Sequence, residues 1–367
     1  MSTRIRELRE RLDLNQDQLG QRVGVTRQTI AAWEGGQRDP SITQFTRLAL
    51  ELRVPVEVLF PADISSTKTA VHLLFRADNA NVLSETDQDL LTRRASDYAF
   101  IERLVGLLPL IPEARPLIDY EEDAVEQVAR ETRDWLGVAD APLGDVFALI
   151  ERKGLKVIRE RLPSRVWGFS AYTEEWGGVI FVNTRAEGRE IPTERQYFTA
   201  LHELGHLIFH RREYTQPSPP VGKKDPREAA ADHFAGAVLL PAAALKAELR
   251  QYRGRWLPEP LLIDIKKRYG VSVGTILFRA AQLGIITPKQ RGQQFGMLKK
   301  AYPDNFSEPP VSIPDPVGLH RLQRLVYGAL VTEKITESKA AEILQCSLSE
   351  IRDELVNWLQ GEEDDAI

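Results

Sequence analysis

The five residues His202-Glu203-Leu204-Gly205-His206 restrict the fold of this chain more than any other stretch. Four residues of α-helix advance about 6 Å and turn slightly more than once around the axis, so both histidines would leave one face of a helix. The surrounding sequence indicates such a helix over residues 193–209. Two ring nitrogens on one face can converge on zinc at about 2.0–2.1 Å. We therefore predict that His202 and His206 hold one zinc ion per chain.

Two carboxylates further along the chain repeat this spacing. A second helix is predicted over residues 227–240, and Glu228 and Asp232 share one of its faces. A catalytic zinc ion needs a third protein ligand, and a ligating histidine usually donates its other N–H to a carboxylate. We predict Glu228 as the third ligand and Asp232 as the carboxylate that orients a ligating histidine. An acidic pair that faces solvent remains the alternative.

Glu203 follows the first histidine directly and is predicted to be the general base, which takes a proton from water and later returns it. His210 shares the face of the two histidines but lies about 12 Å along the helix from His202, so a single ion cannot bind all three. His233 is predicted to be structural. Because H-E-x-x-H also occurs in helices that bind no metal, a helix with hydrogen-bonded histidines remains the alternative.

Three short runs with β-strand character precede the histidine helix, over residues 155–158, 166–172 and 179–182. An edge supplied by residues 167–172 or 178–183 could bind an extended peptide by strand addition, although a plain core hairpin fits the same pattern. Most other segments have helical periodicity. The predicted fold class is therefore mainly α with a small β-sheet (α+β).

Residues 1–61 are predicted to form an all-α domain that binds DNA. Helices over 16–23 and 26–33, joined at Gly24, have the spacing of a helix-turn-helix, with Thr26 as the N-cap of the second helix. Polar side chains at the start of such a helix can reach base edges, and a preceding helix N-terminus suits a phosphate. The residues predicted to contact DNA are Gln16, Thr26, Arg27, Gln28, Thr29 and Arg38.

The charge of the chain limits how it could bind nucleic acid. The formal net charge is −5, and residues 1–60 carry nine Lys or Arg against eight Asp or Glu. Non-specific affinity for DNA should therefore be weak. We expect sequence-specific binding by a homodimer on two half-sites. A helical module that docks a protein instead of DNA is the alternative.

The remaining sequence suggests a helical connector over 62–140, a metal-binding domain over 141–295 and a C-terminal helical segment over 317–360. Five prolines within 303–316 indicate a linker before that last segment. Ala341, Gln345 and Ile351 repeat the spacing of Gly20, Gly24 and Ile30, which indicates a second unit similar to a helix-turn-helix. Its second helix is acidic and would repel phosphates, so protein docking is the favoured interpretation.

Several features indicate a cytoplasmic protein. Cys346 is the single cysteine, so no disulfide can form within the chain. The first residues alternate charged and apolar side chains and lack the apolar core of a signal peptide. No stretch reaches the roughly 18–20 apolar residues that span a bilayer, so no membrane partner is expected.

The segment H-E-L-G-H, followed by E-A-A-A-D-H-F-A-G-A-V-L-L-P, resembles the ImmA/IrrE family of bacterial and phage metallopeptidases over about residues 140–290. Residues 3–60, with V-T-R-Q-T-I-A-A-W-E-G-G-Q-R-D-P-S, resemble XRE/Cro-type repressor domains. The first resemblance implies a gluzincin-like arrangement, with His202, His206 and Glu228 as zinc ligands and Glu203 as the base. For the oxyanion-stabilising residue of such enzymes, Tyr172 and His210 are the guesses available.

Family members that are proteases cut DNA-binding repressors. The resemblance therefore implies a DNA-binding zinc metallopeptidase that regulates transcription by cleaving a repressor or another regulatory protein. The alternative is a non-catalytic transcriptional regulator or antitoxin that uses the same fold for sensing or for binding a partner. A proline-rich loop over residues 215–226 is expected to cover the site.

Overall fold

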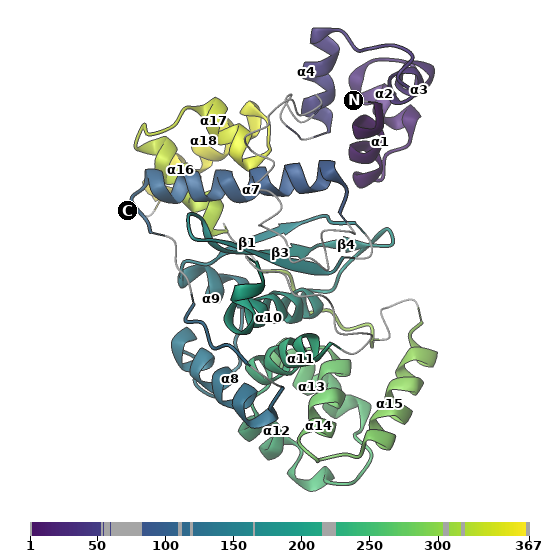
Figure 1. The fold of residues 1–367 in the computed structure, drawn as a ribbon, viewed down its shortest axis with the longest axis vertical. Coiled ribbons are helices and arrows are strands. Elements are labelled where there is room, and N and C mark those ends of the chain that lie inside the picture. Colours follow the sequence, from purple (N-terminus) through teal and green to yellow (C-terminus); the bar gives the residue numbers. More distant parts are fainter. Residues whose placement is uncertain are drawn as a thin grey trace. The chain divides into compact units, whose positions relative to one another are not determined.

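A computed structural model describes residues 2–52, 54, 59, 83–108, 112–117, 120–163, 166–214, 225–303, 308–316 and 320–364. The chain divides into two compact units. The first unit comprises Met1–Pro109, Thr173–Trp176 and Leu319–Ile367, and the second comprises Leu110–Tyr172 and Gly177–Gly318. Helices dominate and the sheets are small, which confirms the predicted α+β class (Figure 1).

The first unit begins with four short helices: α1 (Ser2–Arg11), α2 (Gln16–Val23), α3 (Arg27–Glu34) and α4 (Ile42–Glu51). Apolar residues on their inner faces form one core, including Leu19, Val23, Ile30 and Trp33. Gly24 ends α2 with a φ of 77°, a left-handed conformation that disfavours residues with a Cβ atom. Thr26 accepts a hydrogen bond from the Thr29 amide and caps α3. The predicted helix-turn-helix and its N-cap are confirmed.

The other helices that the structure describes in the first unit are α7 (Glu85–Leu104), α16 (Arg321–Val331), α17 (Glu337–Leu344) and α18 (Leu348–Asp364). The α17–α18 turn has the geometry of the α2–α3 turn. Gln345 has a φ of 54°, and the Cys346 amide donates to the Ala341 carbonyl at 3.1 Å, as the Val25 amide does to Gly20 at 2.8 Å. The predicted repeat of spacing therefore corresponds to a second turn of the same kind.

The second unit contains a sheet of three strands in the order β1-β3-β2: β1 (Lys156–Glu160), β2 (Gly168–Thr173) and β3 (Gly177–Asn183). Strands β1 and β3 are parallel, with Lys156 opposite Val179. The three predicted β-runs are confirmed within a few residues. The suggestion that 178–183 supplies a sheet edge is wrong, because β3 lies in the middle and is buried along its length. Of the two proposed runs, β2 lies at an edge.

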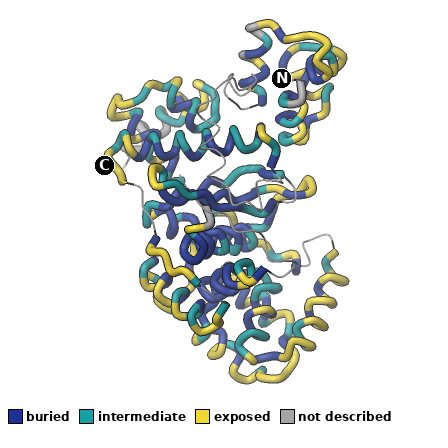
Figure 2. The backbone as a smooth tube through the Cα atoms, viewed as in Figure 1, coloured by how far each residue is buried: buried dark blue, intermediate teal, exposed yellow. Residues whose placement is uncertain are grey.

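Helices α10 (Thr193–Phe209) and α11 (Pro226–Leu239) pack against each other, and α10 also contacts β3 (Figure 1). Both helices lie in the most buried part of this unit (Figure 2). A Cβ atom on Gly205 would lie 3.0 Å from the Phe234 ring and 3.4 Å from the Ala231 backbone. Small residues therefore allow the helix axes to approach closely.

The rest of the second unit surrounds this helix pair. Its elements are α8 (Glu122–Leu136), α9 (Val146–Arg152), β4 (Arg185–Ala186), β5 (Arg189–Glu190), η2 (Arg211–Tyr214), α12 (Ala242–Glu248), η3 (Arg250–Tyr252), α13 (Glu259–Tyr269), α14 (Val273–Gln282) and α15 (Pro288–Ala301). These helices agree with the helical periodicity expected for most of the chain.

The proline-rich stretch from 303 to 316 is not a free linker where the structure describes it. Glu308 accepts hydrogen bonds from the Val273 and Gly274 amides, at the start of α14, and from the buried Lys266 ammonium group at 3.1 Å. Lys266 also donates to Glu194, in the first turn of α10, at 2.5 Å. Asp315 accepts from Arg159 on β1 at 2.7 Å. Residues 308–316 are thus bound to the second unit.

Candidate metal centre

Helix α11 begins where Asp225 accepts a hydrogen bond from the Arg227 amide and Pro226 occupies the first helical turn. This start places Glu228 in the first turn of α11, opposite the middle of α10. The proline-rich loop over residues 215–226 was expected to cover the site, and its residues 215–224 lie outside the described residues.

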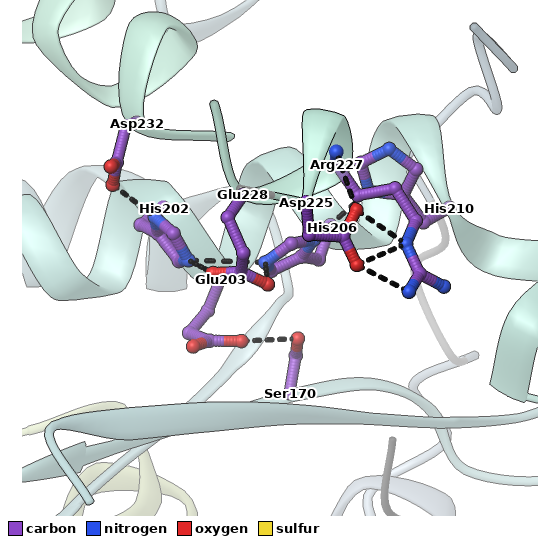
Figure 3. A network of polar contacts seen from close by, with 9 residues as sticks. All are labelled: Ser170, His202, Glu203, His206, His210, Asp225, Arg227, Glu228 and Asp232. Atoms are coloured by element: carbon purple, nitrogen blue, oxygen red, sulfur yellow. Dashed lines mark hydrogen bonds and ion pairs between the residues drawn. The ribbon is translucent and has the colours of Figure 1, made fainter. Parts of the chain in front are cut away.

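Three side chains from these two helices meet at one point (Figure 3). The Nε2 atoms of His202 and His206 are 3.0 Å apart. The Glu228 carboxylate lies 3.2 Å from Nε2 of His202 and 3.4 Å from Nε2 of His206. Two ligands on a tetrahedral zinc ion at about 2.0–2.1 Å are separated by about 3.3 Å. The three separations therefore fit a single shared zinc ion, although the ligand roles themselves remain predictions.

Each histidine of the cluster has a partner at its other ring nitrogen. Nδ1 of His202 lies 2.9 Å from the Asp232 carboxylate, the partner expected from the sequence. Nδ1 of His206 lies 2.9 Å from Nδ1 of the buried His210. The structure therefore places His210 behind a cluster histidine, at the side away from Glu228, and this placement does not favour the guess that it stabilises an oxyanion. The same guess for Tyr172 stays untested.

Glu203 leaves α10 next to the cluster and is largely buried. Its Oε2 atom accepts a hydrogen bond of 2.6 Å from Ser170 on β2 (Figure 3). Ser170 is not among the residues predicted from the sequence, because only the packing of β2 against α10 brings it next to Glu203. Gly168 allows β2 to lie this close to α10, because a Cβ atom at this position would lie 2.4 Å from Thr199 of α10 and 3.7 Å from Cγ of Glu203.

The charges around the cluster favour a cation. Burial alone would lower the pKa of His202, but hydrogen bonds to Asp232 and Glu228 and the nearby Glu203 charge outweigh burial and raise this pKa to about 10. In the absence of metal, the His202 ring is therefore the cation, with a proton on both nitrogens. A bound metal ion would compensate the same negative charges in place of that proton.

His233 follows Asp232 on α11 but belongs to a different network. Its Nε2 atom lies 2.7 Å from Glu126 of α8, and its Nδ1 atom lies 3.0 Å from the Tyr120 hydroxyl. Burial opposes ionisation of Glu126, but hydrogen bonds from His233 and Arg279 lower its pKa to about 2. This network joins α8, α11 and α14, as expected for a structural histidine.

The predicted DNA-contacting residues gather at the start of α3 and on either side of it. Arg27, Gln28 and Arg38 are exposed. Thr26 and Thr29 form the cap, with their hydroxyl oxygens 3.0 Å apart. Gln16 differs, because its amide donates to Glu34 at 2.9 Å and so joins α2 to α3. Their contacts with DNA remain predictions.

One basic residue in this region was missed. The Arg47 guanidinium of α4 lies over the α2–α3 turn, 3.2 Å from the position of a Cβ atom on Gly24. Its place in a different helix, twenty-three positions after Gly24 in sequence, gave no local signal.

Comparisons with known proteins define the class. Residues 5–59 match the family model described as helix-turn-helix, and residues 150–281 match a peptidase-family model described as the IrrE N-terminal-like domain. The chain is 46% identical over 69 residues to an uncharacterized HTH-type transcriptional regulator of Methanothermobacter thermautotrophicus, which is 18% of this chain and 100% of that protein. The chain therefore belongs to the helix-turn-helix transcriptional regulators and carries an IrrE-like domain, and both resemblances are confirmed.

Other relatives match less of their own length or of this chain. An HTH-type regulator of Bacillus subtilis is 38% identical over 60 residues, which is 16% of this chain and 91% of that protein. A repressor protein of a Salmonella phage is 33% identical over 72 residues, 20% of this chain and 33% of the repressor. A solved transcriptional regulator of Mycobacterium tuberculosis has a TM-score of 0.33 at 19% identity, and the match spans about half of each chain, 54%.

The domain content makes this chain a DNA-binding regulator of transcription. Among the described residues, no helix combines the length and the apolar character needed to cross a membrane.

Proposed function

We propose that this regulator is also a zinc-dependent metalloendopeptidase, which cleaves a repressor or another regulatory protein. The observation that carries the proposal is the meeting of His202, His206 and Glu228 at separations that suit one zinc ion. The peptidase-family match over residues 150–281 supports it. In this proposal the catalytic domain comprises residues 141–295, between the 62–140 connector and the 317–360 segment.

Zinc in such a site supplies a Lewis acid that polarises a carbonyl group and makes water acidic near neutral pH. Glu203 takes the proton from the attacking water and delivers it to the leaving amine. The Ser170 hydroxyl donates to one Glu203 oxygen and would hold the carboxylate in one orientation for the proton transfer. Asp232 fixes His202 with its Nε2 atom toward the cluster.

The DNA-binding domain, residues 1–61, would bring this activity to a promoter in the cytoplasm. Arg27 and Gln28 are exposed at the N-terminus of α3, where side chains of a reading helix meet base edges. Thr29, Thr26, Gln16 and Arg38 would position the helix on the backbone. A homodimer would place two copies of α3 on two half-sites.

Glu203→Gln tests the catalytic part of this proposal. The amide cannot accept the proton, so cleavage of proteins encoded beside this gene or bound to its promoter should fall by about 10²–10⁴-fold. Zinc content should stay at one ion per chain, measured by elemental analysis. Mass spectrometry of the candidate substrates measures cleavage, and Glu190→Gln, an exposed site on β5, is the matched control.

The alternative function predicts a different result. A regulator or antitoxin that uses the zinc domain to sense a signal or bind a partner would leave every candidate protein intact. Wild type and Glu203→Gln would then regulate transcription equally well. That pair of results would replace the catalytic proposal with the binding function.

A further inference from the structure

A third histidine of the α10 segment lies behind the cluster. His210 is one helical turn after His206, and its backbone amide donates to the His206 carbonyl at 2.9 Å. The residue is 6% exposed, and the centroid of its ring lies 5.1 Å from that of the His206 ring. The two Nδ1 atoms are 2.9 Å apart, within hydrogen-bonding distance.

This contact between two like atoms constrains where the protons lie. In a hydrogen bond between two Nδ1 atoms, one nitrogen carries the proton and the other offers a lone pair. A neutral histidine that binds a metal through Nε2 must carry its proton on Nδ1. His206 would therefore be the donor and His210 the acceptor, with the proton of His210 on its own Nε2 atom.

We propose that His210 is a positioning residue for His206. It accepts the hydrogen bond from Nδ1–H of His206, which fixes the ring orientation and keeps the Nε2 lone pair directed at His202 and Glu228. This inference rests on the zinc site of the proposed function but does not depend on peptide cleavage.

A neutral partner suits this position better than the usual carboxylate. The carboxylates of Glu203 and Glu228 lie beside the space for one divalent ion, and that of Asp232 lies behind His202 (Figure 3). A fourth carboxylate, at a position that is 6% exposed, would add the cost of burying a further charge. An imidazole acceptor orients His206 without adding charge.

Two variants separate hydrogen bonding from packing at this position. In His210→Asn the side-chain oxygen can occupy the place of Nδ1 and accept the same hydrogen bond. In His210→Leu a methyl group occupies that place and accepts nothing. We expect His210→Leu to weaken zinc binding by about 10–100-fold, and His210→Asn to stay close to wild type. Competition with a chromophoric chelator measures both affinities.

His233→Asn is the matched control. It also removes a buried imidazole from the second unit, but its partners are Glu126 and Tyr120 rather than the cluster. We expect its zinc affinity to equal that of wild type. If His233→Asn and His210→Leu weaken zinc binding equally, the effect is a general loosening and the positioning role is wrong.

A second measurement detects the hydrogen bond itself. In full-length protein with ¹⁵N-labelled histidine, the hydrogen bond should give a scalar coupling between the two Nδ1 nuclei with or without zinc, and in the zinc-loaded protein the proton should lie on His206. The coupling should vanish in His210→Leu. Its absence from wild type, or a proton on Nδ1 of His210 in the zinc-loaded protein, would overturn the inference. If wild type binds no zinc, the proposed function fails, whereas this coupling still decides the role of His210.

Discussion

At the scale of single residues, the environment of His202 explains why the cluster suits a cation. Asp232 binds one ring nitrogen, Glu228 approaches the other, and Glu203 follows in the sequence. Their negative charge overcomes the cost of burial and raises the pKa of this ring to about 10. A proton and a metal ion therefore compete for the same nitrogen.

This competition gives zinc binding a defined pH dependence. Below a pKa of about 10 the metal-free ring is protonated, and zinc must displace one proton. We expect apparent zinc affinity to rise about tenfold per pH unit between pH 6.5 and 8.5. Calorimetric titration in buffers of different ionisation enthalpy counts the released protons.

Asp232→Asn is the informative comparison for this prediction. Removing the carboxylate lowers the pKa of His202, so fewer protons should be released and the pH dependence should flatten. An affinity that does not change with pH in wild type would show that His202 is already neutral without metal.

Sequence spacing predicted the residues of the cluster but not all of their partners. His202 and His206 follow from helical geometry, and Glu228 and Asp232 follow from the same rule on a second helix. Ser170 could not be found in this way, because its contact with Glu203 depends on how a strand packs on a helix. His210 was rightly excluded from the cluster, but its contact with His206 depends on ring orientation, which spacing does not specify.

At the scale of secondary-structure elements, the α2–α3 and α17–α18 turns share a backbone geometry but differ in sequence. Both turns use a left-handed residue after the first helix, Gly24 with a φ of 77° and Gln345 with a φ of 54°. Glycine adopts this conformation without strain, whereas a residue with a Cβ atom does not.

The two turns should therefore respond oppositely to substitution. Gly24→Ala should lower the free energy of unfolding of the first unit by about 1 kcal/mol. Gln345→Gly should raise it by about 0.5–1 kcal/mol, because strain is relieved at a helix C-terminus. Urea denaturation followed by circular dichroism measures both changes. If Gln345→Gly is destabilising, the strain assigned to this turn is absent.

The second helix of each pair has a different surface. Arg27 and Gln28 begin α3, whereas the half-exposed Leu348 and the acidic Glu350 lie at the start of α18. The acidic helix repels phosphates, so protein docking remains our interpretation of the C-terminal pair. The two pairs share the geometry of the turn, whereas the side chains at the start of the second helix differ in chemistry.

Predictions about secondary-structure elements failed where tertiary packing determines the neighbours of a segment. A continuous apolar run predicted a strand near residues 179–182, but the run does not reveal whether neighbours pair on both sides. Five prolines predicted a linker over 303–316, since proline excludes helix and sheet. Proline content does not reveal that Glu308 and Asp315 bind α14 and β1.

At the scale of the whole molecule, the predicted DNA contacts and the predicted metal ligands are different residues. Arg27→Ala combined with Gln28→Ala should weaken operator binding by about 1–3 kcal/mol per lost base contact. Zinc content should not change. Chelation of zinc should instead lower the melting temperature of the second unit and leave operator affinity unaltered.

Fluorescence anisotropy with operator DNA and calorimetry with and without chelator measure these effects. Arg253→Ala, an exposed site after η3, controls for the loss of one positive charge. If chelation weakens operator binding as strongly as the double substitution, the two functions are coupled and the separation is wrong.

The hydrogen bonds of Glu308 determine where a separately produced fragment of the second unit can end. Lys266 and the backbone amides at the start of α14 donate to the Glu308 carboxylate. Glu308 is synthesised only after the ribosome has added some forty further residues. A fragment that ends at residue 295 or earlier would leave a buried ammonium group with one acid partner fewer and a helix end with amides open to water. A fragment that contains this unit should therefore extend at least through residue 316, so that Glu308 and Asp315 are both included.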